Sequence, residues 1–299
     1  MHVLIIADIE GGSGCWSRSA AAYMTLAWRR ACLDMTKDVR SVVLALKKAG
    51  VHQITIHDFH RTGYNIIPQK MPSGCRMISG YKAGPVPGIG DPGDVDLLML
   101  IGMHAPSGSE GFLAHTLTSR VASLQVNGRL LSEAELFSAS LYCYGIRPVF
   151  FSGCPLACKQ AATYLKGILT YPIDKTPGSN QNGFNVNAWR NGLANAAVAS
   201  LENTTSQAYR LTGPFTVRLQ LRDGPSAADR LARRWHLNRK GNALYFDCLT
   251  FTELYDRLLS ICYLTPLLAR HRKAALGLYR LWGYLGHLWI RTLPDRGNI

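Results

Sequence analysis

Short apolar runs alternate with longer stretches of helical period along the first half of this chain. The strand-like runs cover residues 2–8, 53–60, 95–105 and 147–153. A helical pattern spans 20–50, and we expect a break near Met35 and Thr36, where Thr36 would cap a second helix that ends at Gly50. Buried strands separated by helices indicate a parallel sheet built from βαβ crossovers.

A different pattern begins at the dipeptide Asn127-Gly128, which short apolar runs flank on both sides. This dipeptide favours a tight type I′ hairpin. Residues 174–187 are rich in Gly, Pro, Ser and Asn and predict a loop. The remaining pattern predicts a helix at 188–202, a strand at 215–221 and a helix at 251–264.

Together these elements predict an α/β fold. We expect an open, mostly parallel sheet flanked by helices, with an inserted β-hairpin, a smaller C-terminal α+β part and an extra C-terminal helix. The expected organisation is an α/β domain at 1–165, a smaller α+β region at 166–267 that completes the fold, and a basic and apolar helical extension at 268–299.

The chain is strongly basic, with 33 Lys and Arg against 19 Asp and Glu and a formal net charge of +14. Such a charge fits a nucleic acid, an anionic membrane or an acidic substrate as partner, and it also fits a solvated surface with a strong bias. The basic residues gather mainly in 210–240 and 270–273. We favour the biased surface, and nucleic acid is not expected as a partner.

Residues 274–290 form an unusually apolar segment near the end of the sequence, with Arg280 and His287 among many large apolar side chains. The segment is short for a membrane span. We favour a helix that packs against protein, within an oligomer contact. The alternatives are a helix on a membrane surface beside the basic cluster 270–273, and a marginal transmembrane span.

Eight cysteines are scattered through the chain, and no two form a CxxC pair. We expect reduced thiols and, with no secretory signal pattern at the start, a cytoplasmic protein. Cys154 and Cys158 would share one face of a helix, but one such pair is weak evidence for a metal or a disulfide.

Acids and imidazoles follow three of the predicted strands. They are Asp8, Glu10, His57, Asp58, His60 and His104. Residues two apart in a strand point to the same face, so Asp8 and Glu10 can address one point. The carboxyl ends of parallel strands meet at one edge, where open α/β sheets bind ligands. The sequence therefore predicts a polar site at this edge.

Three more candidates follow the third predicted strand: His115, and then Glu133 and Glu135 near a helix start. Carboxylates and imidazoles without thiolates suit a pair of divalent ions such as zinc, an arrangement that recurs in aminopeptidases and phosphatases. On spacing alone, a metal site and a set of ordinary packed or surface residues stand as equal interpretations. Glu135 is expected to be a solvated helix residue.

Five segments, "ADIEG", "HDFH", "GMHA", "AHT" and "NGRLLSEAEL", occur in an order and spacing that resemble the zinc-dependent D-aminopeptidases of peptidase family M55. The resemblance covers roughly residues 1–150 and continues more weakly to about residue 267. It implies a metallo-aminopeptidase that removes N-terminal D-residues from short peptides, with two Zn²⁺ per subunit. It also implies a ring-shaped homo-oligomer.

Carried onto this sequence, the resemblance implies that the zinc ligands are Asp8, Glu10, His60, His104 and Glu133. Asp8 would bridge the two ions, and His115 would act as catalytic base or nucleophile. We further expect Asp58 to orient a ligating imidazole, because such rings usually give their other N–H to an oxygen.

The sequence departs from the family pattern around the expected substrate pocket. It has Gly153-Cys154-Pro155 where related proteins commonly carry acids, and residues 175–189 keep little of the pattern apart from Lys175. The D-preference and the accepted peptide length are therefore open. Two alternatives also stay open: a metal-dependent hydrolase of another amide or biosynthetic intermediate, and a basic nucleic-acid or membrane-binding protein with a vestigial site.

Overall fold

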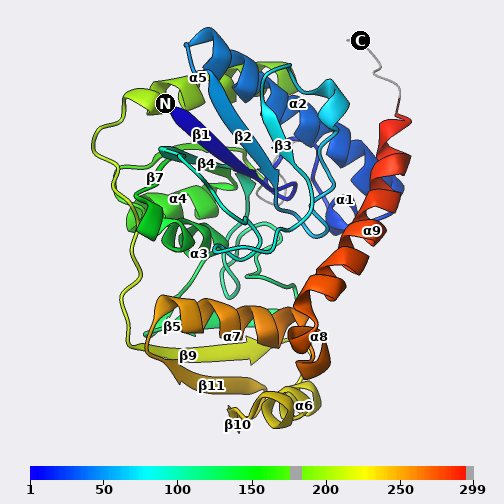
Figure 1. The fold of residues 1–299 in the computed structure, drawn as a ribbon, viewed down its shortest axis with the longest axis vertical. Helices are drawn as coiled ribbons and strands as arrows, with labels where there is room; N and C mark the ends of the chain where they lie inside the picture. Colours follow the sequence, from blue (N-terminus) through cyan, green and yellow to red (C-terminus); the bar gives the residue numbers. More distant parts are fainter. Residues whose placement is uncertain (176–183, 294–299) are drawn as a thin grey trace.

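A computed structural model describes residues 1–175 and 184–293 of the chain. Within them, six parallel strands form one sheet in the order β3-β2-β1-β4-β7-β8 (Figure 1). The strands are β1 (His2–Ala7), β2 (Gln53–Asp58), β3 (Arg76–Ile78), β4 (Leu97–Met103), β7 (Arg147–Gly153) and β8 (Leu169–Pro172). The predicted parallel sheet is confirmed, although the short β3 and β8 were not expected.

Successive side chains of each strand enter opposite layers of the core, as the pleat requires. In β1, Val3 and Ile5 pack with the helices α1 (Arg18–Ala21), α2 (Leu26–Lys48) and α5 (Val186–Ala199). Leu4 and Ile6 face the other way, toward α3 (Glu133–Ser140) and α4 (Pro155–Tyr164). Because both faces are covered, the strands read as continuous apolar runs in the sequence.

A second, antiparallel sheet lies below the first in Figure 1, in the order β10-β11-β9-β5-β6. Its strands are β5 (Val121–Val126), β6 (Arg129–Leu130), β9 (Phe215–Leu221), β10 (Asn238–Lys240) and β11 (Ala243–Cys248). The helices α6 (Pro225–Trp235) and α7 (Phe251–Tyr263) pack with it in the same core. The predicted hairpin therefore joins the C-terminal strands, since β5 pairs with β9. Its turn has positive φ at both Asn127 and Gly128, as a type I′ turn requires.

The predicted break near Met35 and Thr36 is wrong, because α2 runs unbroken through both residues. The Thr36 hydroxyl donates to the carbonyl of Cys32 (2.7 Å) and accepts from the amide of Ile67 (3.0 Å). The side chain that suggested a cap thus bonds back along the helix and anchors the loop after β2. Short 3₁₀ turns complete the described elements at Pro68–Lys70, Tyr142–Tyr144 and Ser200–Glu202.

Glu135 is buried, so its expected role as a solvated helix residue is wrong. Its carboxylate accepts from Arg129 (2.6 Å) and from the Tyr209 hydroxyl (2.7 Å). It also accepts from the amide of Ser132 (3.2 Å) in a capping box at the start of α3. Glu135 therefore fixes the helix that presents its neighbour Glu133.

All eight cysteines are free thiols, which agrees with the expected reduced state. Cys154 and Cys158 are both buried at the start of α4, and the Cys158 thiol donates to the carbonyl of Gly153 (3.6 Å). Burial raises the pKa of Cys158 to about 12, so the thiol stays protonated at neutral pH.

The C-terminal segment forms α8 (Pro266–Arg270) and α9 (Arg272–Arg291), and α9 runs along the side of the molecule toward α1 and α2 (Figure 1). The Tyr23 hydroxyl donates to the carbonyl of Trp282 (2.5 Å), and Arg29 donates to the carbonyl of Trp289 (3.1 Å). One face of this helix thus packs against α2 and the residues between α1 and α2 of the same chain, and the expected oligomer contact stays a prediction. Across residues 1–175 and 184–293, no helix has the length and apolar character needed to cross a bilayer, so the predicted alternative of a transmembrane span is wrong.

Candidate metal centre

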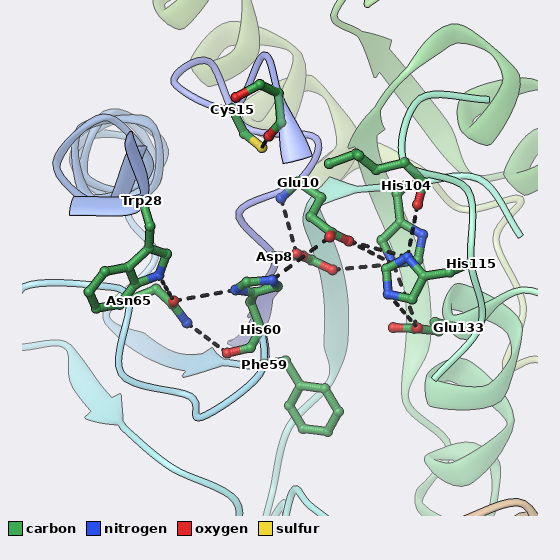
Figure 2. A network of polar contacts seen from close by, with 12 residues as sticks. Asp8, Glu10, Cys15, Trp28, Phe59, His60, Asn65, His104, His115 and Glu133 are labelled. Atoms are coloured by element: carbon green, nitrogen blue, oxygen red, sulfur yellow. Dashed lines mark hydrogen bonds and ion pairs between the residues drawn. The ribbon is translucent and has the colours of Figure 1, made fainter. Parts of the chain in front are cut away.

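Six predicted site residues lie together at the carboxyl edge of the parallel sheet (Figure 2). They are Asp8, Glu10, His60, His104, His115 and Glu133. Asp8 and Glu10 follow β1, and His60 and His104 follow β2 and β4. The loop between β4 and β5 carries His115, and the first turn of α3 carries Glu133. The residues that follow β1, β2 and β4 converge because these strands are parallel and end at the same edge of the sheet.

A close backbone crossing brings His104 beside Asp8. The β4–β7 register shifts between Leu100 and Met103, and Gly102 has a φ of 75°. A Cβ atom on Gly102 would lie 2.0 Å from the carbonyl oxygen of Asp8. Only glycine tolerates both this conformation and this approach, so Gly102 allows the ends of β1 and β4 to meet.

The nitrogen and oxygen atoms at the centre are spaced as ligands of a shared cation. His104 Nε2 lies 3.6 Å from Asp8 Oδ2, 3.5 Å from Glu10 Oε2 and 3.6 Å from Glu133 Oε1. His60 Nε2 lies 3.9 Å from Glu10 Oε1. Atoms bound to one zinc ion at about 2.1 Å are about 3.4 Å apart in a tetrahedron. These separations are too long for good hydrogen bonds and fit a bound ion.

Two buried atoms of the cluster have no hydrogen-bond partner, namely Glu10 Oε2 and His104 Nε2. Buried polar atoms without a partner are rare and costly, and both of these point into the same centre. A divalent cation would satisfy both atoms, so the residues fit a metal.

Electrostatics favour a cation at the same place. Burial, opposed by His104, raises the pKa of Asp8 to about 7 and that of Glu10 to about 8. Burial alone would lower the pKa of His104, but the carboxylates of Glu133, Glu10 and Asp8 together raise it well above its usual value. Burial therefore makes Asp8 and Glu10 bind protons more readily in the absence of a positive ion, and a divalent cation would replace those protons.

Asp58 is linked to the imidazole of His60 through a third residue, Asn65, and not directly as expected. The imidazole of His60 contacts the side chain of Asn65, with Nδ1 and Oδ1 3.3 Å apart. Asn65 in turn donates through Nδ2 to Asp58 (2.8 Å) and to the carbonyl of His60 (2.7 Å). The expectation that Asp58 itself accepts from a ligating imidazole is wrong, because the side-chain amide of Asn65 lies between Asp58 and the imidazole of His60. Asp58 orients Asn65, and Asn65 orients His60.

Asn65→Ala is predicted to weaken zinc affinity by about 10- to 100-fold, because the outer partner of a ligating histidine fixes its ring and tautomer. Competition with a chromogenic zinc chelator measures this loss. Asn195→Ala is the matched control, since Asn195 is exposed on α5. Equal zinc affinity in the Asn65 and Asn195 variants would contradict this role.

Lys175 contacts the turn that follows Glu10. Its ammonium group donates to the carbonyls of Gly12 (2.6 Å) and Cys15, and it lies 4.2 Å from the centre of the Trp16 ring. Burial lowers the pKa of Lys175 to about 8. The side chain thus holds the glycine turn in place rather than contacting the cluster. Of the expected loop at 174–187, residues 176–183 lie outside the described residues.

A small pocket of about 170 Å³ opens beside the cluster. Its lining includes Glu10 and His115, and it also includes three arginines that were not predicted as site residues: Arg18, Arg61 and Arg222. These arginines come from separate segments and share no spacing in the sequence, and Asn65 has no motif of its own. Only the folded chain brings them to the site.

Comparisons with known proteins identify the family of this chain. The sequence model of peptidase family M55, described as D-aminopeptidase, matches residues 1–259. The D-aminopeptidase of Bacillus subtilis (strain 168) is 22% identical over 178 residues, which cover 59% of this chain and 64% of that protein. The match thus spans just under two thirds of that relative's length.

A solved structure also shares the fold. It is the Zn-dependent D-aminopeptidase DppA from Bacillus subtilis, described as a self-compartmentalizing protease, with a TM-score of 0.77 and 18% identity. The superposition covers 88% of this chain and 97% of that chain. Since the family model covers most of the sequence, including all six clustered residues, the chain belongs to peptidase family M55, the D-aminopeptidases.

Proposed function

We propose that this chain is a zinc-dependent D-aminopeptidase with two zinc ions per subunit. One observation carries the two-ion site: two of the three candidate ligand groups in the cluster share one carboxylate, that of Asp8. Asp8, Glu10 and His60 form one group, and Asp8, His104 and Glu133 form the other. Asp8 would bridge the ions, because it alone belongs to both of these groups.

The donor set supports zinc. Each group combines imidazole nitrogen with carboxylate oxygen and contains no thiolate, which is the pattern of catalytic zinc sites. Catalytic sites also leave positions open for water and substrate. When bound, the two ions would polarise the scissile carbonyl and lower the pKa of the attacking water.

His115 is placed to move a proton. Its ring stacks on that of His104 with centroids 3.9 Å apart, and its Nδ1 lies 2.9 Å from the carbonyl of Leu113. Donation from Nδ1–H to that carbonyl leaves Nε2 as the basic nitrogen. Burial, reinforced by the charge of His104, lowers the pKa of His115 to about 4, so the ring is neutral and can accept a proton at pH 7.

His115 also forms a third group with Glu10 and His104, so a ligand role is the competing assignment. His115 Nδ1 lies 3.5 Å from Glu10 Oε2, but we assign His115 as the base because this nitrogen already has a backbone partner and Nε2 lies 3.9 Å from Glu133. From Nε2, His115 would take a proton from water during attack and give it to the leaving amine.

The experiment for this function is a hydrolysis panel on the zinc-loaded full chain. Matched D- and L-aminoacyl dipeptides and amides would be compared by kcat/KM. Faster cleavage of the D-series supports the proposal. Preference for the L-series, or turnover of a different amide alone, would contradict D-aminopeptidase activity and favour a hydrolase of another substrate.

We further propose that the chain forms a homo-oligomer, in line with the self-compartmentalizing description of the solved relative. The outer face of α9 supports this assembly. It exposes Leu278 (71%), Leu281 (60%), Leu285 (54%) and Leu288 (42%). Their alternating spacing of three and four residues forms a seam suited to a second helix, here that of another copy.

Leu285→Asp is predicted to shift the protein toward smaller species, because a charge would enter the centre of this seam. Sedimentation velocity measures the shift. Leu249→Asp is the matched control, since Leu249 is 78% exposed and lies outside α9. An unchanged mass in the Leu285 variant would contradict the α9 contact, and liposome binding that this variant abolishes would favour the membrane-surface alternative.

A further inference from the structure

Three arginines line the pocket beside the metal cluster and lack a carboxylate partner. Arg18 begins α1, Arg61 directly follows His60, and Arg222 follows β9. Within the described residues, no carboxylate oxygen lies within 4.0 Å of any of their guanidinium groups. Asp223, which directly follows Arg222 in the sequence, pairs instead with Arg120 at 2.5 Å.

Arg222 is held in position by the loop that carries His115. Its Nε donates to the carbonyl of Ser119 (3.1 Å), and its Nη2 donates to the carbonyl of Ala114 (3.3 Å). Ala114 directly precedes His115, so the guanidinium is fixed relative to the proposed base. The long side chain is therefore partly preorganised, which reduces the entropy lost when it binds a ligand.

Arg61 is placed by an unusual backbone conformation. Its φ of 48° lies in the left-handed region, which non-glycine residues seldom adopt. Arg61 directly follows the candidate ligand His60 and lines the pocket. Non-glycine residues are held in this region where the surrounding structure imposes it, often at ligand sites.

Three guanidinium groups without a carboxylate partner line one small pocket. Their positive charges repel one another and together attract an anion. Arginine is well matched to carboxylate, because its planar fork can donate two parallel hydrogen bonds. The same pocket is lined by Glu10 and His115, so an anion bound there lies next to the reacting centre. A peptide residue spans at most about 3.6 Å, so a carboxylate in this pocket lies one or two residues from the scissile bond.

We infer that Arg18, Arg61 and Arg222 bind a substrate carboxylate, so that the preferred substrates are dipeptides or tripeptides that carry this charge just after the cleaved bond. This inference rests on the proposed peptidase function and specifies its substrate class. The carboxylate is that of a free C-terminus or that of an acidic side chain in the residue after the bond.

The test compares matched peptides on the zinc-loaded full chain. D-Ala-D-Ala is compared with its C-terminal amide, and the amide of D-Ala-D-Glu is compared with the amide of D-Ala-D-Gln. Cleavage of at least one charged peptide is expected to exceed that of its neutral partner by about 10- to 100-fold in kcat/KM, since charge-assisted hydrogen bonds are lost with the carboxylate. The first pair tests whether the bound carboxylate is a free C-terminus, and the second pair tests whether it is an acidic side chain.

Arg61→Gln and Arg18→Gln are each expected to lower the charged-to-neutral ratio by about 10-fold. Arg222→Gln should do the same, but Arg222 also braces the His115 loop, so the other two variants carry the test. Arg230→Gln is the matched control, because Arg230 is an exposed arginine of α6 outside the pocket lining. It should keep the wild-type ratio.

A second readout does not depend on turnover. Calorimetry with zinc-loaded His115→Ala protein measures the dissociation constants of the same peptide pairs without cleavage. Ratios near one in both pairs, in turnover and in binding, would overturn the arginine site while leaving peptidase activity intact. Failure to cleave any peptide would overturn the proposed function, and the binding ratios would then still decide whether the arginines recognise a carboxylate.

Discussion

Asp8→Asn is expected to remove both zinc ions and to lower kcat/KM by about 1,000-fold or more. Asp8 belongs to both ligand groups, so its loss deprives each ion of a carboxylate and removes the proposed bridge. Asparagine has nearly the same shape, but it leaves the buried imidazole of His104 facing a neutral group. Loss of metal assistance forfeits several kcal/mol of transition-state stabilisation, which corresponds to at least this factor.

The matched control for this substitution is Asp94→Asn, because Asp94 is exposed and lies before β4, away from the cluster. Zinc content and kcat/KM in this variant should match wild type. Circular dichroism of both variants would check that the fold is kept. If Asp8→Asn bound no zinc yet cleaved peptides at the wild-type rate, metal-dependent hydrolysis would be excluded.

His115→Ala is expected to keep both zinc ions while kcat falls by about 100- to 10,000-fold, the usual contribution of a positioned general base. The five remaining side chains of the cluster still complete the two groups that share Asp8. Since His115 would act on the proton and not on the ground-state peptide, KM should change far less than kcat.

His52→Gln is the matched control for this variant, because His52 is exposed just before β2. It should be indistinguishable from wild type. Loss of one zinc ion per chain in His115→Ala would contradict the assignment and make His115 a ligand, as its grouping with Glu10 and His104 permits.

The sequence alone was sufficient to predict the edge on which the cluster lies. Strands of a parallel sheet present their carboxyl ends together, so Asp8, His60 and His104 could be placed at one edge from three apolar runs. The order of five short motifs then predicted Glu133 and His115. The structure brings all of these side chains together.

The parts that could not be predicted depend on tertiary contacts. Thr36 has the chemistry of a helix cap, but burial beside Ile67 gives its hydroxyl two partners inside an unbroken helix. Glu135 looks like a surface residue in sequence, yet Arg129 and Tyr209 arrive from distant segments to pair with it. Local pattern carries no information about such partners.

The same limit explains the outer parts of the site. Asn65 stands between Asp58 and His60 because the loop after β2 folds back over the strand end. The pocket arginines come from α1, from the loop after β2 and from the end of β9, so no spacing in the sequence connects them. Residues at strand ends are predictable, whereas residues on returning loops are not.

Zinc content per chain, measured by plasma mass spectrometry on purified wild-type protein after zinc loading and desalting, tests the central claim most directly. We predict two zinc ions per chain in wild type and at most a trace in Asp8→Asn. One ion per chain would contradict the bridged pair, and no bound zinc in a protein that still hydrolyses D-aminoacyl peptides would contradict the metal centre itself.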